Sequence, residues 1–392
     1  MPKFQLRSRC ALLAASALFM APSSHAVSPT LVLAATLQPE TMYLGFIAPV
    51  TSAEFMRTVG LVFDNIPLVR DFYGPAEVWL PRARQWAIKP PTPINPPFKV
   101  PPKPDATHVD SPYSQVIAFG DSMSDTGNLF KFTQANGGAG LPQAPSSLGR
   151  FSDGMVALEV MANQLALPLT NYCFSGAQTG KGNLLPFWSW QRGVLFQIDE
   201  FHRTLSSQGQ ASNDPQALYF VWAGPNDFFE GTNMYSKQTA RTAASNHLKA
   251  IRSLYARGSR HFLIPLMPDL SLTPQSAAFE KQDPGYKDNA RLRSEEYKAE
   301  LLKVFEQARA ELPGIDIHTY DNLTAMREVL PQVAAEGVNI TEACYTGKLQ
   351  SGQTVRAVCE HPERYFFWDK NHPTERTARP MGAAFAKAAV TP

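Results

Sequence analysis

The chain has 392 residues, of which 44% are hydrophobic and 18% charged. This is an ordinary globular composition, and the length suffices for one large α/β domain plus a smaller one. The formal net charge is only +2 and no basic cluster stands out, which argues against nucleic acid as a partner.

The first residues have the layout of a secretory signal peptide. Lys3, Arg7 and Arg9 precede an apolar run at 10–21, and small residues follow up to Ala26. The alternative is a membrane anchor, but the run is too short to span roughly 30 Å of hydrocarbon. Removing the leader leaves 33 basic against 34 acidic residues. We therefore expect a secreted protein, with the periplasm as the other destination and no transmembrane segment in the mature chain.

A proline tract divides the remainder. Residues 90–104 contain eight prolines, so we predict an extended polyproline linker over 90–112. Residues 27–89 hold short β-prone pieces and predict a small, mainly β domain. The main domain is then 113–392.

Within the main domain, short apolar runs alternate with helical patterns. This alternation predicts β-α-β units, hence a parallel sheet with helices on both faces and a ligand site at the carboxyl ends of the strands. The expected strands are Gln115–Phe119, Leu169–Phe174, Ala217–Ala223, His261–Leu266 and Ile315–Tyr320. The expected helices lie near 153–165, 237–257, 289–312 and 374–388.

Ser122 follows the first expected strand, in the segment GDSMSDTGN at 120–128. Gly120 permits a tight turn, and amides at a helix start can stabilise negative charge on an attacked carbonyl oxygen. Ser122 is therefore a candidate nucleophile, although a helix-capping serine gives the same local pattern.

Asp369 and His372 lie three residues apart near the C-terminus. His372 can take a proton from a serine hydroxyl, while Asp369 can fix the imidazole tautomer. Pro373 keeps both residues on a loop before the last helix. The commoner alternative for such a pair is a helix-start aspartate beside a surface histidine.

Two further strands are followed by possible oxyanion donors. Gly176 can offer an open backbone N–H, and Asn226 can offer a side-chain N–H. Each segment can also be an ordinary turn. Taken together with Ser122, Asp369 and His372, they supply the groups needed for acyl transfer.

The cysteines predict one disulfide. Cys344 and Cys359 bracket a short polar loop, and their pairing would stabilise the fold by roughly 3 kcal/mol. Cys173 sits in an apolar strand and is expected to be a buried free thiol. Without a CxxC spacing there is no support for a zinc site.

In these segments the chain resembles the GDSL or SGNH hydrolase family. GDSMSDTGN, FSGA at 174–177, GPND at 224–227 and DKNHP at 369–373 match the family's four blocks in order. The resemblance implies a flavodoxin-like three-layer αβα sandwich and a Ser122, His372 and Asp369 triad. It also implies an oxyanion hole from Ser122, Gly176 and Asn226, with no metal or organic cofactor.

A narrower resemblance is to the bacterial thermolabile haemolysins, which are lecithin-dependent phospholipases related to acyltransferases. It rests on GRFSDG at 149–154, LMPDL at 266–270 and the segment from Cys359 to Asp369. The resemblance implies phospholipase A and lysophospholipase activity on a phospholipid or membrane surface.

Aromatic residues near the expected site favour a lipid substrate. Trp188, Trp190 and Phe228 follow the second and third strands and are candidate acyl-binding residues, although core packing is the alternative. Two other functions stay open. One is an esterase of small or carbohydrate esters, and the other is a membrane-binding toxin whose hydrolase activity is not essential.

Overall fold

The computed structural model describes residues 108–135, 140–185, 192–347 and 357–391, together with three strands before them. The predicted signal peptide and most of the predicted linker lie outside the described residues. The chain divides into two compact units, 1–90 and 91–392. Among the described helices, none combines the length and apolar character needed to span a bilayer.

In the first unit, the described strands β1 (Leu33–Gln38) and β2 (Thr41–Phe46) pair antiparallel. Leu33 lies opposite Phe46, and Gln38 lies opposite Thr41. Both strands fall within 27–89, the segment in which short β-prone pieces were expected.

The second unit is built on a six-stranded sheet with the order β3-β5-β4-β6-β7-β8. Its last five strands are mutually parallel, as the alternating pattern predicts. The bounds are β3 Phe98–Val100, β4 Val116–Gly120, β5 Leu169–Asn171, β6 Leu218–Trp222, β7 His261–Leu263 and β8 Asp316–His318.

The edge strand β3 was not predicted. It falls within the segment expected to be an extended polyproline linker, and it pairs antiparallel with β5. Phe98, Lys99 and Val100 interrupt the prolines, so this stretch can both donate and accept ladder hydrogen bonds. An edge position is also where a proline-flanked strand is tolerated.

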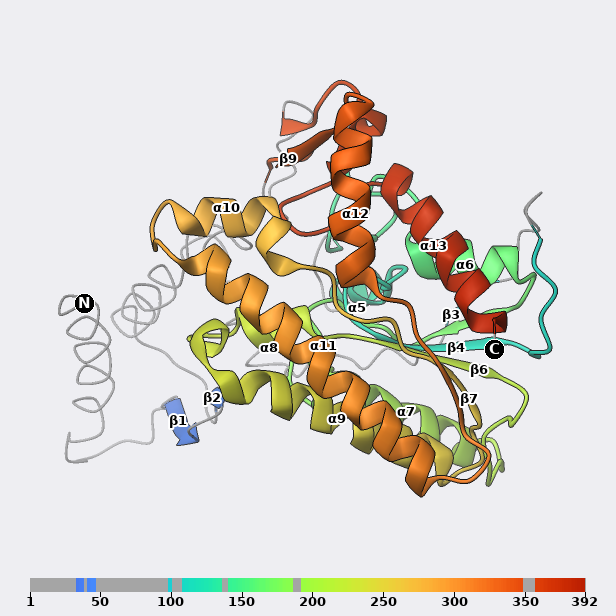
Figure 1. Ribbon diagram of the computed structural model, residues 1–392. Coiled ribbons are helices and arrows are strands. Elements are labelled where there is room, and N and C mark those ends of the chain that lie inside the picture. Colours follow the sequence, from blue (N-terminus) through green and yellow to red (C-terminus); the bar gives the residue numbers. More distant parts are fainter. Residues whose placement is uncertain are drawn as a thin grey trace, which may run out of the picture. The chain divides into compact units, whose positions relative to one another are not determined.

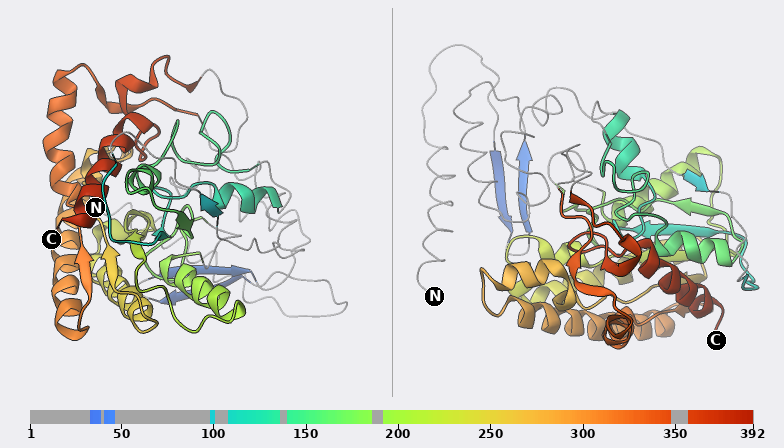
Figure 2. Two further views of the ribbon diagram at one scale, coloured as in Figure 1. Left: turned by 90° about the vertical axis from the view of Figure 1, so that its right-hand side faces the viewer. Right: turned by 90° about the horizontal axis from the view of Figure 1, so that it is seen from above.

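Helices cover both faces of this sheet (Figure 1). Side chains of β4 and β6 alternate between the two faces, and every residue of both strands is buried. Ile117 and Phe119 pack with one helical layer, which consists of α7 (Val194–Ser207), α9 (Lys237–Tyr255) and α11 (Tyr286–Glu311). Val116 and Ala118 pack with the other layer, α6 (Ala157–Gln164) and α13 (Glu375–Val390). Figure 2 shows α13 (red) beside α6 (green) on their shared face.

The longer helices include four that the sequence predicts and three that it does not. The predicted ones are α6 Ala157–Gln164, α9 Lys237–Tyr255, α11 Tyr286–Glu311 and α13 Glu375–Val390. The others are α5 Asn128–Ala135, α7 Val194–Ser207 and α12 Asn322–Ala335.

Shorter elements complete the described part of the unit. The short helices are α8 Pro225–Phe229, α10 Pro274–Glu280, η1 Asn233–Tyr235, η2 Leu270–Leu272 and η4 Pro362–Arg364. A two-stranded parallel sheet joins β9 Asn339–Ala343 to β10 Tyr365–Phe367. This small sheet leads directly into the loop that carries Asp369 and His372.

Candidate active site

Ser122 stands two residues beyond β4, on a turn whose start is tightly held. Gly120 exchanges hydrogen bonds with the side-chain amide of Gln197, donating to Oε1 at 2.9 Å and accepting from Nε2 at 2.8 Å. A Cβ at Gly120 would lie 2.4 Å from the carbonyl oxygen of Trp222. Only glycine therefore lets β4 end this close to β6, and the position of Ser122 follows from that approach.

The structure brings Ser122, His372 and Asp369 together, as the sequence predicts. His372 Nε2 lies 2.7 Å from Ser122 Oγ, although 250 residues separate them. His372 Nδ1 lies 2.8 Å from both carboxylate oxygens of Asp369. With the Nδ1 proton directed to the carboxylate, Nε2 is left to accept the serine proton. Ser122 and His372 are both buried.

The loop of Asp369 is held by its own backbone. Asp369 Oδ1 accepts hydrogen bonds at 2.9 Å from the N–H groups of Asn371 and His372. Burial by itself raises the pKa of Asp369, but His372 and these donors outweigh it and bring the pKa below its ordinary value. The carboxylate therefore stays ionised and can stabilise an imidazolium. The ring of Phe151 packs against His372 with centroids 4.8 Å apart.

The disulfide predicted between Cys344 and Cys359 is present, and Cys173 is a buried free thiol. The disulfide borders the loop of the histidine. Cys344 N–H donates to Phe367 O at 3.0 Å, and the Tyr345 ring stacks on Trp368 at 5.5 Å. Cys344 and Tyr345, at the start of the crosslinked loop, thus contact the residues that immediately precede Asp369.

Three N–H groups predicted as oxyanion donors have no acceptor among the described residues. No described residue accepts a hydrogen bond from the backbone N–H of Ser122 or Gly176. Asn226 Nδ2 donates one hydrogen bond, to Ala177 O at 3.0 Å, which ties α8 to the Gly176 turn and leaves its second N–H. Gly176 has φ +80°, and a Cβ there would lie 2.4 Å from Asn183 Oδ1. The residues predicted as oxyanion donors therefore follow the adjacent strands β4, β5 and β6.

Asp125 supports this arrangement and was not predicted. Its carboxylate is fully buried and accepts hydrogen bonds from the N–H groups of Gly127 at 2.8 Å and Asn128 at 2.6 Å. It also accepts from Ser175 N–H at 2.9 Å and Ser175 Oγ at 2.7 Å. Asp125 thus caps α5 and fixes the residue before Gly176. The only local signal was an aspartate three residues before a helix start, which is a common cap.

Two other buried carboxyl groups lie close to the site. Burial raises the pKa of Asp121 to about 7, against a hydrogen bond from Met123 N–H at 3.0 Å and the nearby His372. Burial also raises the pKa of Asp227 to about 7, although Thr179 donates to it from N–H and Oγ. Neither carboxyl touches the serine hydroxyl.

Of the three aromatic residues predicted to bind substrate, the structure describes only Phe228. Phe228 is 1% exposed, belongs to the core, and packs against Tyr297 with ring centroids 5.6 Å apart. The prediction that Phe228 contacts substrate is therefore wrong, because the short helix α8 turns this side chain into the core. Trp188 and Trp190 lie outside the described residues.

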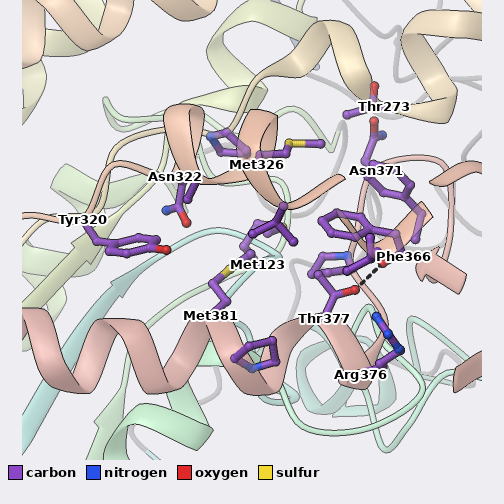
Figure 3. Close-up of a pocket in the computed structure, with 17 residues that line it drawn as sticks. Met123, Thr273, Tyr320, Asn322, Met326, Phe366, Asn371, Arg376, Thr377 and Met381 are labelled. Carbon is purple, nitrogen blue, oxygen red and sulfur yellow. Dashed lines mark hydrogen bonds between the residues drawn. The ribbon is translucent and has the colours of Figure 1, made fainter. Parts of the chain in front are cut away.

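The structure also holds an apolar pocket that the sequence did not predict (Figure 3). It has a volume of about 140 Å³ and is bounded by α12, α13 and β10. Met123, which follows Ser122, and Pro373, which follows His372, both line it. No local pattern in the sequence indicates this pocket, because its lining comes from four separate segments of the chain, at 123, 268–273, 320–333 and 366–381.

A nucleophile, a base and an orienting carboxylate at the carboxyl end of a parallel sheet define the class of serine-dependent acyl-transfer enzymes. Residues 116–385 match the model of the GDSL-like lipase/acylhydrolase family. The chain belongs to this family. It is therefore a carboxylic ester hydrolase, with the α/β fold that the resemblance implies.

The individual proteins that are similar to the chain share low sequence identity with it. A thermolabile hemolysin of Vibrio parahaemolyticus is 27% identical over 70% of this chain, which spans 63% of that protein's length. A GDSL esterase/lipase of Arabidopsis thaliana is 26% identical over 69% of this chain and 88% of its own. A solved member of the lipolytic G-D-S-L family from Veillonella parvula is 18% identical, with a TM-score of 0.37, over 70% of this chain and 96% of its own.

Proposed function

We propose that this protein is a secreted serine esterase that hydrolyses fatty acyl esters of glycerophospholipids. The observation that carries the chemistry is the 2.7 Å contact between His372 Nε2 and Ser122 Oγ, with Asp369 behind the imidazole. The likeness to a thermolabile hemolysin supports a lipid substrate. The predicted leader and the disulfide support export.

In the first half-reaction, Ser122 Oγ attacks the ester carbonyl carbon while its proton passes to His372 Nε2. The carbonyl π electrons move onto oxygen, and the resulting oxyanion accepts hydrogen bonds from Ser122 N–H, Gly176 N–H and Asn226 Nδ2. As the carbonyl re-forms, the bond to the lysophospholipid oxygen breaks. That oxygen takes the proton from His372, leaving an acyl-serine.

In the second half-reaction, a water molecule attacks the acyl-serine and gives one proton to His372. The second tetrahedral oxyanion collapses and expels Ser122 Oγ, which recovers its proton from the imidazolium. A free fatty acid leaves, and the enzyme returns to its starting state. The scheme balances with these residues and water, so it requires no cofactor. Replacing the water by another alcohol gives acyl transfer instead of hydrolysis.

The test is a product analysis on phosphatidylcholine vesicles with the wild type and Ser122→Ala. We expect the wild type to release fatty acid and lysophosphatidylcholine, and the variant to release neither. Turnover of acetylated sugars and short acyl esters, with intact phospholipid, would instead establish an esterase of small or carbohydrate esters. Full lysis of erythrocytes by Ser122→Ala would point to a membrane-binding toxin.

A further inference from the structure

The oxyanion donors Gly176 and Asn226 follow strands that are not neighbours in the sheet. Gly176 lies beyond β5 and Asn226 lies in α8 beyond β6, and β4 separates these two strands. The hydrogen bonds of the sheet therefore do not join the two loops directly. Since an oxyanion must reach both donors at once, a contact beyond the strand ends has to bring α8 onto the Gly176 turn.

Two carboxyl groups, one in α8 and one in the residue that follows it, supply this contact. Asp227 accepts a hydrogen bond on each carboxylate oxygen, from Thr179 N–H at 2.9 Å and from Thr179 Oγ at 2.7 Å. Glu230 accepts from Gln178 Nε2 at 2.8 Å. Two consecutive residues that closely follow Gly176 are thus bound from the side of α8.

The contact between Asp227 and Thr179 is the better supported of the two. Thr179 is 1% exposed, and Asp227 is also buried. Each partner is held by a further residue. Asn246 Nδ2 in α9 donates to Thr179 Oγ at 3.2 Å, and Asn233 Nδ2 in η1 donates to the backbone O of Asp227 at 2.8 Å. The contact is therefore fixed from both sides.

The direction of the Asn226 amide depends on where α8 lies. The two N–H bonds of an amide NH₂ group stand at a fixed angle in one plane, so the bond to Ala177 O at 3.0 Å sets the direction of the other N–H. The Gly176 turn is held separately, by the hydrogen bonds between Asp125 and Ser175. A displacement of α8 would thus turn Asn226 away from the oxyanion while Gly176 stays in place.

We infer that Asp227 and Thr179 are positioning residues that hold the Asn226 amide in the oxyanion hole. They act through α8 and through the bond from Asn226 to Ala177 O. The inference rests on the proposed serine mechanism and adds how one of its oxyanion donors is kept in place. A misplacement of about 1 Å at a catalytic group can cost about a hundredfold in rate, so the contact matters for kcat.

The first test removes the Thr179 hydroxyl with Thr179→Val, which keeps the shape of the side chain. We expect kcat on p-nitrophenyl butyrate to fall at least about tenfold with little change in KM, because the donor acts on charge that develops in the transition state. Thr179→Ser keeps the hydroxyl and should retain most of the wild-type kcat. The matched control is Thr319→Val, which removes a hydroxyl that donates to Ile264 O at 2.8 Å just beyond β7 and β8. It should leave kcat unchanged.

A double-mutant cycle separates positioning from a general loss of structure. Asn226→Ala has no amide left to place, so adding Thr179→Val to it should lower kcat by no more than about twofold further. Losses that multiply in full in the double variant would overturn the inference. An unchanged kcat in folded Thr179→Val, or a raised KM at unchanged kcat, would overturn it too.

Asp227→Asn guards against a folding defect in Thr179→Val. Its side chain can accept from Thr179 N–H through Oδ1 and donate to Thr179 Oγ through Nδ2. We expect a variant that is folded by far-UV circular dichroism and Tm, that retains most of the wild-type kcat, and that loses nothing further in the Asn226→Ala background. A loss of kcat as large as that of Asn226→Ala, and additive to it, would overturn the inference.

The two levels of the account fail in different ways. If the serine mechanism is wrong, Ser122→Ala retains turnover and Asn226→Ala has the wild-type kcat. If only the positioning role is wrong, Ser122→Ala is inactive and Asn226→Ala is slow, while Thr179→Val either has the wild-type kcat or loses the same factor with and without Asn226.

Discussion

Asp125 and Ser175 are joined by two hydrogen bonds, of 2.9 and 2.7 Å, across 50 residues of sequence. The contact links the loop of the nucleophile to the turn that carries Gly176. Geometry at the reacting carbon therefore depends on a carboxylate that never touches it.

Removing this carboxylate should disturb both stability and rate. Asp125→Ala leaves several buried N–H groups and one hydroxyl without an acceptor, at about 1–3 kcal/mol for each group that stays unpaired. We expect at least about 3 kcal/mol of destabilisation in urea unfolding, and a lower kcat from the variant that remains folded. Asp110→Ala, at an exposed carboxylate, is the matched control. Equal unfolding midpoints for the two variants would contradict this role.

The buried Asp121 predicts a dependence of stability on pH. Its pKa rises from 3.8 in the unfolded reference to about 7 in the folded chain. Between these values the unfolded chain releases a proton that the folded chain keeps. Stability therefore falls as pH rises from about 4 to about 7, by up to about 4 kcal/mol.

Asp121→Asn removes this titration while keeping an oxygen that can accept from Met123 N–H. The difference in unfolding free energy between variant and wild type should grow in the variant's favour from pH 4 to pH 7. Asp227 titrates in the same window, so some dependence remains in the variant. Urea unfolding at several pH values measures the difference. A constant difference across the window would show that Asp121 does not titrate there.

The disulfide should stabilise the fold and support the loop of the histidine. It closes a loop with a sequence separation of 15, for which the chain-entropy model gives about 3 kcal/mol. Cys344→Ala with Cys359→Ala should lower Tm. It should also lower kcat, because the segment at Cys344, which pairs with Phe367 next to the loop of the histidine, is no longer held by the crosslink. Dithiothreitol should reproduce both effects in the wild type. If it lowers Tm without changing kcat, the disulfide supports only the fold.

Asn226 should contribute to the rate and little to ground-state binding. Asn226→Ala removes one oxyanion donor, which costs roughly 10²–10³ in kcat in enzymes of this kind. KM should change by much less, because the donor acts on charge that develops in the transition state. Steady-state kinetics on p-nitrophenyl butyrate separates the two constants. A raised KM at unchanged kcat would assign Asn226 to substrate binding instead.

The parallel strands could be predicted because each lies in a short run that contains several apolar residues and stands between helical patterns. Ser122, Gly176, Asn226 and the Asp369–His372 pair could be predicted because they follow such strands or precede the last helix. Hydrogen bonds such as the two between Gln197 and Gly120 leave no local pattern, since 77 residues separate the partners. The prediction that Phe228 contacts substrate was wrong because an apolar residue after a strand can face either the substrate or the core. Only tertiary packing decides which of the two it faces.

Detection of the acyl-serine intermediate is the most direct test of the claim that Ser122 is the nucleophile. The wild type would be mixed with p-nitrophenyl hexanoate, quenched in acid within one turnover and digested for mass spectrometry. We predict a hexanoyl group on the peptide that contains Ser122, and no adduct with Ser122→Ala. Acylation of a different residue, or full turnover by Ser122→Ala, would contradict the account.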